Sequence, residues 1–411
     1  MSPSPGMSTV TVDPVDRLLE EATTGASIIK NRAALRFDYM PRVIKHRDDE
    51  QEQVAQTLLP VLKGSRPSNL LVYGRPGTGK TLVVRRVLVK VQAKAAGGGF
   101  PIRLVYANSK NETTLYGLLV SFGRQLGLNE KRIPSTGLSI SEVFRRLVNE
   151  IKERSINAVF VIDEIDHLAR ITSRSHKDIL YQMTRANERL GDGSLTLVGI
   201  SNDLAFKDGL DPRVISSLGE EEIVFASYTT GQIRLILEER VADSLERTDA
   251  AEPAALNLCA AMAGSEHGDA RRAIDTLRVA AEAAEREGAA SITPGHVRAA
   301  AAKMEERKEI AALRSYPLHE KLLVIAVMRS PGASTGEVYA AYRDLCRRTG
   351  QRSLTQRRAT QMLSEVEMSG IVSGRITHQG MHGRTKKFRL LVAAETVSEA
   401  LGEDLALSEL L

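Results

Sequence analysis

Residues 69–81 read NLLVYGRPGTGKT, and the class of fold can be predicted from this segment. NLLVY (69–73) is a short apolar run that ends at Gly74, which predicts a buried strand. Gly74–Thr81 fits the pattern G-x-x-x-x-G-K-[ST], and the helical run LVVRRVLVKVQAK (82–94) follows it. A strand, a glycine-rich turn and a helix in this order predict a loop that binds phosphate groups.

The residue types in this loop suit a nucleoside triphosphate. Glycines let backbone N–H groups turn toward phosphate oxygens, and the helix N-terminus adds a favourable dipole. We expect Lys80 to reach the β- and γ-phosphates and the Thr81 hydroxyl to ligate Mg²⁺. A turn without a ligand is disfavoured, because the pattern is complete and stands in its proper context. The nucleotide-binding residues predicted here are Gly74, Pro76, Gly77, Thr78, Gly79, Lys80 and Thr81.

Two carboxylates close another apolar strand. AVFVI (158–162) leads directly into Asp163 and Glu164, and acids near a buried strand are costly unless they serve a purpose. Because the same chain has a phosphate loop, Asp163 is expected to hold the Mg²⁺ shell and Glu164 to polarise the attacking water. The alternative is that both are solvated acids at the end of a strand. Asn202 ends a further strand, where its amide could orient that water; a turn-forming role is the open alternative.

The last part of the chain predicts a winged helix-turn-helix. HEKLLVIAVMR (319–329), TGEVYAAYRDLCRR (335–348) and SLTQRRATQMLSEVEMSG (353–370) are helical, and IVSGRITHQGMHGRTKKFRLLV (371–392) forms two strands around a basic tip. Residues 312–391 hold 14 Lys and Arg against 5 Asp and Glu, a balance of +9, while the rest of the chain carries −4. This local excess indicates a nucleic-acid partner.

Five residues are candidates for DNA contacts. The apolar stripe of the third helix leaves Gln356 and Arg357 on its outer side, where they can reach base edges; a solvated basic face is the alternative. Near the hairpin tip, Arg384, Lys386 and Lys387 supply charge for phosphates or the minor groove.

The patterns divide the chain into an α/β part and helical parts. Short strands alternate with helices up to about residue 227, which predicts a parallel sheet covered on both faces. The pattern is then helical and rich in alanine as far as about residue 308. The expected organisation is a flexible leader (1–15), a nucleotide-binding α/β domain (16–227), an all-helical domain (228–310), a winged-helix domain (311–392) and a C-terminal tail (393–411).

Composition excludes several classes of protein. The chain has 411 residues with 42% hydrophobic and 26% charged residues, as in soluble proteins of two or three domains. Its two cysteines make no disulfide framework, so we expect a reducing cytoplasm. The leader lacks the apolar segment of a signal peptide, and no apolar run is long enough to span a bilayer. No membrane partner is expected.

Together the motifs resemble those of the AAA+ ATPases. The phosphate loop, DEID (163–166) and ISND (200–203) carry this resemblance. Four further segments, YMPRVIKHRDDE (39–50), LDPRVISSL (210–218), GDARRAID (268–275) and GMHGRTKKFRL (380–390), resemble archaeal replication initiators of the origin-recognition/cell-division-control type. The resemblance covers about residues 35–392. It implies an AAA+ P-loop parallel sheet domain, an all-helical lid domain and a C-terminal winged helix-turn-helix domain.

The resemblance also implies roles for single residues. Val43, Ile44 and His46 would lie near the adenine base. Arg271, in GDAR, would be a lid arginine that touches the γ-phosphate. Arg213, in DPR, would offer a finger to the nucleotide of a neighbouring copy, with a salt bridge at a helix start as the open alternative.

The function that the resemblance implies is the initiation of DNA replication. Such a protein binds double-stranded origin DNA through its winged helix and through an insertion, here about residues 110–132. ATP or ADP with Mg²⁺ acts as a switch with slow hydrolysis, and the replicative helicase and other initiator copies are partners on the nucleoid. A nucleotide-switched transcriptional regulator is the alternative, although the GDAR and DPR segments argue against it. A clamp-loader-like remodeller is a third alternative, but such proteins usually lack a basic winged helix, which this chain is predicted to have.

Overall fold

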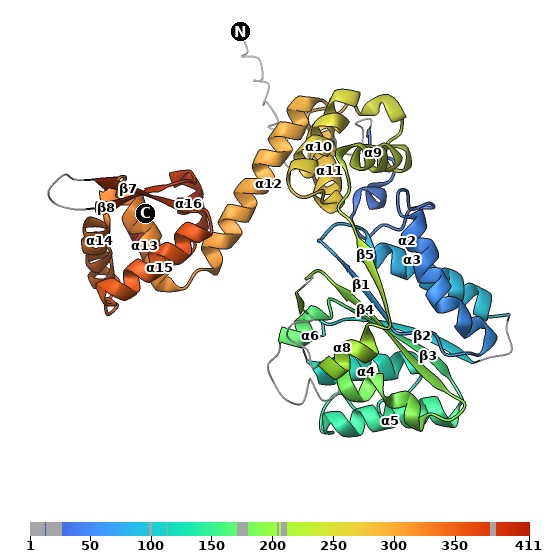
Figure 1. Cartoon of the computed structure of the whole chain (residues 1–411). Coiled ribbons are helices and arrows are strands. Elements are labelled where there is room, and N and C mark those ends of the chain that lie inside the picture. Colours follow the sequence, from blue (N-terminus) through green and yellow to red (C-terminus); the bar gives the residue numbers. More distant parts are fainter. Residues whose placement is uncertain are drawn as a thin grey trace, which may run out of the picture. The chain divides into compact units, whose positions relative to one another are not determined.

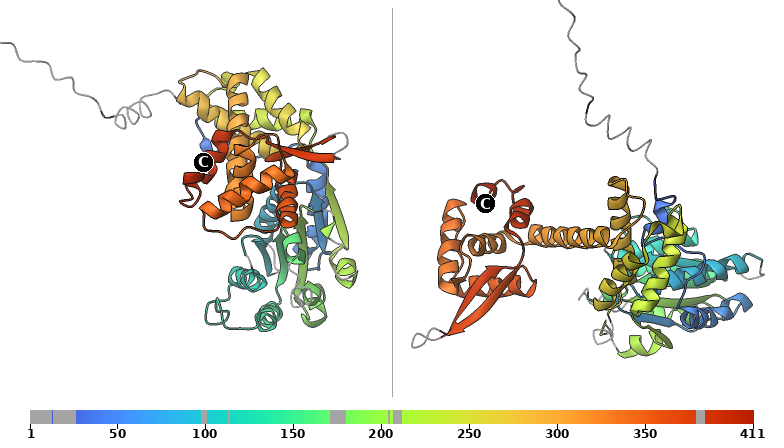
Figure 2. Two further views of the ribbon diagram at one scale, coloured as in Figure 1. Left: turned by 90° about the vertical axis from the view of Figure 1, so that its left-hand side faces the viewer. Right: turned by 90° about the horizontal axis from the view of Figure 1, so that it is seen from above.

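The computed structural model divides into two compact units, Met1–Val297 and Arg298–Leu411 (Figures 1 and 2). Within the described residues, no helix combines the length and the apolar character that crossing a membrane requires. The structure describes residues 13, 27–97, 101–112, 114–170, 180–203, 205–206, 212–378 and 384–411.

The first unit contains a five-stranded sheet in the order β2-β3-β4-β1-β5. All four strand pairs are parallel, which confirms the predicted parallel sheet. The strands are β1 (Leu70–Gly74), β2 (Ile102–Asn108), β3 (Asn157–Asp163), β4 (Ser194–Ser201) and β5 (Glu221–Phe225).

Helices cover both faces of this sheet (Figure 1). Every residue of β3 is buried, and successive residues face opposite layers. Phe160 packs with α4 and α5, whereas Val159 and Val161 pack with α2 and α3. A strand buried on both faces explains the continuous apolar runs in the sequence. The helices of this part are α2 (Asp48–Leu58), α3 (Lys80–Ala95), α4 (Leu115–Leu126), α5 (Ile140–Glu153), α6 (Asp166–Arg170) and α8 (Pro212–Leu218).

The register brings polar residues to one edge of the sheet. Asn108, at the end of β2, pairs with Asp163 at the end of β3. Tyr73 of β1 pairs with Ser201 of β4, so the phosphate loop leaves the sheet at this same edge. Ligands of open α/β sheets bind at the carboxyl ends of the strands.

Three helices follow the sheet and form the helical domain, together with the first turn of α12 (Pro294–Ser315). Residues 27–39 pack on these helices, because Ile29 bridges Leu245 and Arg240 donates hydrogen bonds to the carbonyl oxygens of Ala34 and Tyr39. The structure therefore places this segment with the helical domain, not with the sheet as its position in the sequence predicted. The helices are α9 (Thr230–Ser244), α10 (Pro253–Ser265) and α11 (Ala270–Arg286).

The second unit is a winged helix, as predicted. Its antiparallel sheet has the order β6-β8-β7, and the β7–β8 hairpin projects in the right-hand view of Figure 2. The expected tail, 393–411, is part of this domain, because Val397, Leu401 and Leu407 are buried in its core. The elements are α13 (Leu318–Arg329), β6 (Ala333–Ser334), α14 (Thr335–Arg348), α15 (Gln356–Met368), β7 (Val372–His378), β8 (Arg384–Leu390) and α16 (Ala394–Leu401).

Candidate nucleotide site and DNA-binding surface

The conformation of the phosphate loop requires glycine at two positions. Gly77 has a φ of 75° and Gly79, the N-cap of α3, has a φ of 90°. A Cβ atom on Gly77 would lie 1.8 Å from Oδ1 of Asp269, and one on Gly79 would lie 2.8 Å from Oη of Tyr228. Glycine thus allows both the left-handed backbone and the close approach of the helical domain.

Lys80 is buried at the base of the loop. Its Nζ donates hydrogen bonds to the carbonyl oxygens of Gly74, at 2.7 Å, and Arg75, at 2.8 Å. Burial, and to a lesser degree the nearby Arg271 guanidinium, lowers the pKa of the ammonium to about 8. A phosphate group beside it would favour the charged form.

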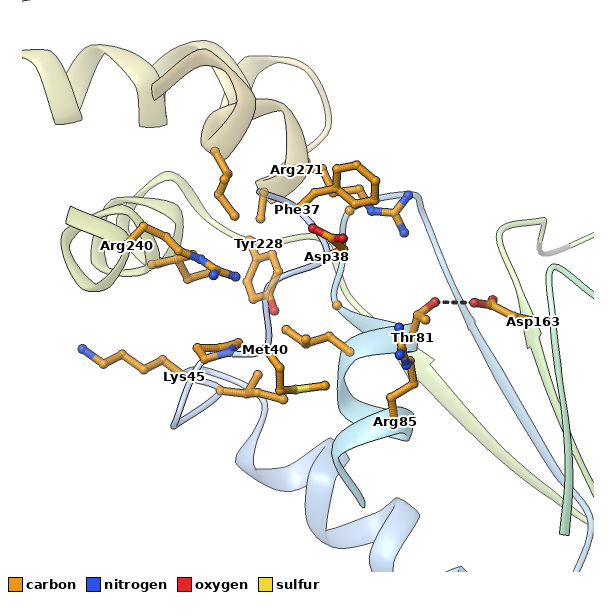
Figure 3. A pocket seen from close by; sticks show the side chains of 18 of the residues that line it. Phe37, Asp38, Met40, Lys45, Thr81, Arg85, Asp163, Tyr228, Arg240 and Arg271 are labelled. Carbon is orange, nitrogen blue, oxygen red and sulfur yellow. Dashed lines mark hydrogen bonds between the residues drawn. The ribbon is translucent and has the colours of Figure 1, made fainter. Parts of the chain in front are cut away.

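Three donors fix the carboxylate of Asp163. Its Oδ2 accepts hydrogen bonds from Oγ1 of Thr81 at 3.0 Å (Figure 3) and from Oη of Tyr106 at 2.6 Å. Its Oδ1 accepts one from the backbone N–H of Glu164 at 2.9 Å. Burial and the adjacent Asp163 raise the pKa of Tyr106, so its hydroxyl keeps its proton and remains a donor. Tyr106 is not among the site residues predicted from the sequence, where its signal is a polar hydroxyl at the end of the apolar run IRLVY (102–106).

Glu164 follows in a strained conformation. Its φ of 53° is left-handed, which is uncommon outside glycine. Its carbonyl oxygen accepts a hydrogen bond from the Ser109 hydroxyl, which holds this turn at the end of β3. Strain of this kind is frequent at functional sites, and here it turns the backbone where Glu164 lines a cavity.

The cavity has a volume of about 280 Å³ and lies between the sheet edge and the helical domain (Figure 3). Its apolar part includes Phe37, Met40, Ile236 and Ile274. An apolar slot beside a phosphate loop suits a base at one end and phosphates at the other. The predicted site residues that line it are Val43, Ile44, Gly77, Gly79, Thr81, Asp163, Glu164, Asn202 and Arg271.

Other predicted residues lie elsewhere. His46 does not line the cavity; its φ is 59°, and its Nε2 is buried without a hydrogen-bond partner among the described residues. Arg213 lies on α8, where its guanidinium is 5.0 Å from the centre of the Tyr181 ring. It is therefore outside this chain's own cavity, which leaves a role toward another copy as a prediction. Gly74, Pro76, Thr78 and Lys80 shape the loop without lining the cavity.

The residues fit a nucleotide and a magnesium ion. Gly77 and Gly79 open the loop to the cavity, and the α3 N-terminus points at the same place. Thr81 and Asp163 supply a hydroxyl and a carboxylate, oxygen ligands of the kind that Mg²⁺ uses together with phosphate oxygens.

The winged helix presents part of the predicted DNA surface. Gln356 and Arg357 are exposed at the start of α15. Lys387 is exposed on β8, but Lys386 forms an ion pair with Glu367 of α15. Arg384 begins β8 by its backbone, while its side chain and residues 379–383 are outside what the structure describes.

The segment expected to be a DNA-contacting insertion contains α4. The apolar residues of α4 are buried against the sheet. Arg124 lies 3.6 Å from Glu130, and Arg132 forms a 2.6 Å ion pair with the buried Glu150. Lys110 is exposed.

The fold and the site define a P-loop nucleotide-binding protein of the AAA+ class with a winged helix. Three family models match, described as "AAA domain" (63–205), "Cdc6 AAA+ ATPase-type lid domain" (234–302) and "CDC6, C terminal winged helix domain" (311–400). An ORC1-type DNA replication protein of Cenarchaeum symbiosum is 65% identical over 399 residues, which cover 97% of each chain. The chain belongs to the family of ORC1-type DNA replication proteins.

Other relatives and solved structures agree. ORC1-type DNA replication protein 1 of Aeropyrum pernix is 40% identical over 96% of this chain and 100% of that protein. The structure of the Aeropyrum pernix ORC1 protein in complex with DNA has a TM-score of 0.79 at 39% identity, covering 94% of this chain and 100% of that one. The crystal structure of Cdc6p from Pyrobaculum aerophilum has a TM-score of 0.59 at 26% identity, covering 92% and 100%.

Proposed function

We propose that this protein initiates DNA replication by binding origin DNA in a manner that depends on ATP. The proposal rests on the shared cavity, which is lined both by Arg271 of the helical domain and by Asp163 and Glu164 at the edge of the sheet. A ligand that bridges two domains can stabilise one arrangement of them over another. The basic winged helix supplies the DNA-binding surface, and the DNA complex of the Aeropyrum pernix relative supports this assignment.

Different residues around the cavity bind the phosphates, hold Mg²⁺ and activate the attacking water. The backbone N–H groups of the loop and Lys80 bind the phosphates, while Thr81 and Asp163 hold Mg²⁺, which neutralises charge on the phosphates when it is bound. Glu164 orients and polarises the attacking water.

Two further residues complete the hydrolytic arrangement. Asn202 orients the water from the neighbouring strand. Arg271 interacts with the γ-phosphate and senses its loss. Because Arg271 comes from the lid, hydrolysis requires the arrangement in which the lid places Arg271 against the nucleotide. Movement of the lid then limits the rate, and turnover is slow.

The adenine base lies in the apolar part of the cavity, next to Val43 and Ile44. His46 does not line the cavity, and its proposed role is to position the segment that contains Val43 and Ile44. Arg213, which is exposed on α8, reaches the nucleotide of a second copy when copies assemble on DNA. The replicative helicase is the partner recruited by the ATP state.

DNA contacts come from α15 and the wing. Gln356 and Arg357 reach base edges in the major groove, and Lys387 and Arg384 contact phosphates. Lys386 supports the wing through its ion pair with Glu367. The segment 110–132 contacts the same duplex from the nucleotide-binding domain.

A binding assay tests the proposal. Fluorescence anisotropy compares an origin-derived duplex with a random duplex of equal length, at physiological salt and with ATP or ADP. We expect the origin duplex to bind at least about tenfold more tightly, since one good bidentate base contact discriminates by about 1–3 kcal/mol. Lys80→Ala is expected to abolish the nucleotide dependence. Equal affinities for both duplexes would remove the initiator function and leave a general DNA-binding protein.

A further inference from the structure

Arg47 is a buried arginine that makes no contact with the nucleotide cavity. It is 4% exposed and occupies the N-cap position of α2, where its side chain makes no capping hydrogen bond. The preceding residue, His46, has a left-handed backbone that turns the chain so that Arg47 faces inward. A buried guanidinium is costly unless its donors are satisfied, so its contacts need an explanation.

The guanidinium of Arg47 connects the phosphate loop with the end of the sheet. Its Nε donates a hydrogen bond to the carbonyl oxygen of Thr78 at 3.0 Å, within the phosphate loop. One terminal nitrogen donates to the carbonyl oxygen of Ala226, directly after β5, and the other pairs with Glu50. Its carbon Cζ lies 4.0 Å from the centre of the Tyr228 ring. This planar set of donors is specific to arginine, because an ammonium cannot reach all these acceptors at once.

Tyr228 extends this connection to the lid. It belongs to the segment between β5 and α9, and its hydroxyl lies against Gly79 of the phosphate loop. A Cβ atom on Gly268 would lie 2.3 Å from the carbonyl oxygen of Tyr228. The turn before α11 therefore packs closely against the backbone of Tyr228. Asp269 and Arg271 follow directly after this turn. The phosphate loop and the turn before Arg271 are thus linked by a continuous series of contacts.

We propose that Arg47 is a positioning residue that transmits the state of the phosphate loop to the lid. The inference rests on the proposed nucleotide binding at the same loop. When phosphates bind, the Thr78 carbonyl and Arg47 move together, and Ala226 and Tyr228 follow. The lid thereby adopts the arrangement in which Arg271 faces the nucleotide.

A direct contact between loop and lid is the competing route. The carbonyl oxygen of Gly77 accepts a hydrogen bond from the backbone N–H of Ala270 at 3.3 Å, and Asp269 packs against Gly77. If this contact is sufficient, loss of the Arg47 connection will leave the response of the lid unchanged. The two routes therefore predict different results for a variant that leaves Gly77 untouched.

Hydrogen–deuterium exchange of the full chain separates the two routes, with and without a non-hydrolysable ATP analogue and Mg²⁺. Protection of residues 74–81 reports binding, and protection of residues 226–229 and 268–274 reports the response of the lid. The variant is Arg47→Lys, which keeps the charge but loses the planar donors. Arg66→Lys is the matched control, because Arg66 is an exposed arginine of the same unit that pairs with Glu220 and lines no part of the cavity.

In the wild type and in the control, we expect the nucleotide to slow exchange of both regions about fivefold or more, the lower end of usual coupling between sites. In Arg47→Lys, the loop should be protected to within about twofold of the wild type, while protection of 268–274 falls below about twofold. A lid response equal to the wild type would overturn the inference, and so would loss of protection in the loop itself. An unprotected loop in the wild type would instead refute nucleotide binding at this site.

Tyr228→Leu provides a second variant in case Arg47→Lys does not fold. It retains the hydrogen bonds of Arg47 but removes the ring and the hydroxyl that contact the guanidinium and Gly79. Because Tyr228 also lines the cavity, the comparison is made at a nucleotide concentration that saturates the protection of residues 74–81. It should show the same separation, with a protected loop and an unprotected 268–274. A purely structural role of Arg47 or Tyr228 would lower the melting temperature and leave the lid response intact, which counts against the inference.

Discussion

Replacing Tyr106 by Phe is expected to weaken the Mg²⁺ dependence of nucleotide binding without disturbing the fold. The Tyr106 hydroxyl donates a 2.6 Å hydrogen bond to the Asp163 carboxylate, which is 5% exposed. A hydrogen bond to a charged group contributes about 1.5–3 kcal/mol net. At 1.4 kcal/mol per factor of ten, its loss corresponds to about 10- to 150-fold. Thr81 and the Glu164 N–H still hold the carboxylate, so the lower end, about tenfold, is expected.

The assay is a Mg²⁺ titration at a fixed concentration of fluorescent ATP analogue, read as the Mg²⁺ concentration at half-saturation. Tyr116→Phe is the matched control, because the Tyr116 hydroxyl donates a 2.8 Å hydrogen bond to the carbonyl oxygen of Pro134 and does not line the cavity. Both variants should melt within a few degrees of the wild type. An unchanged Mg²⁺ midpoint in a folded Tyr106→Phe protein would refute the role given to this hydroxyl in orienting Asp163.

Three further changes test other parts of the structure. ATP affinity should fall about eightfold between pH 7.5 and pH 9. Lys80 binds phosphate as an ammonium, and its pKa of about 8 lies within this range, so the ammonium and the affinity are lost as the pH rises. An affinity that calorimetry finds unchanged over this range would contradict the prediction. Gly77→Ala should lower the free energy of unfolding by about 1–2 kcal/mol or more in urea and weaken ATP binding, since the new Cβ meets both a left-handed backbone and Asp269; unchanged stability would argue against the contact between loop and lid. Lys387→Ala should reduce the salt dependence of DNA affinity by about one phosphate contact, and Lys386→Ala, whose ammonium is already paired, should reduce it less; equal effects would show that the pairing does not matter.

Much of the architecture follows from local features of the sequence. The phosphate loop is a contiguous pattern, so Gly77, Gly79 and Thr81 are recognisable without tertiary information. Alternating apolar runs and helical periodicity are likewise local, and they predict the parallel sheet and the winged helix that the structure confirms. The positions of Asp163 and Glu164 follow because the carboxyl ends of parallel strands share one edge.

The role of the C-terminal residues cannot be predicted from local sequence patterns. Residues 393–411 have an amphipathic helix and scattered leucines, which are compatible with a tail or with a domain element. Only the packing of Val397 and Leu401 into the winged-helix core decides between the two. The ion pair of Lys386 with Glu367 is similar, because charge in the sequence does not reveal which cations already have partners.

The class of fold, the phosphate loop and the basic C-terminal domain can be predicted from sequence, because each is encoded by neighbouring residues. Three contacts are visible only in the folded chain: Tyr106 with Asp163, Arg47 with both Thr78 and Tyr228, and the lid with Gly77. These contacts join residues that lie between 31 and 193 positions apart, for which periodicity and spacing hold no information. They depend on strand register and on how the lid packs against the loop, which are set by the fold as a whole.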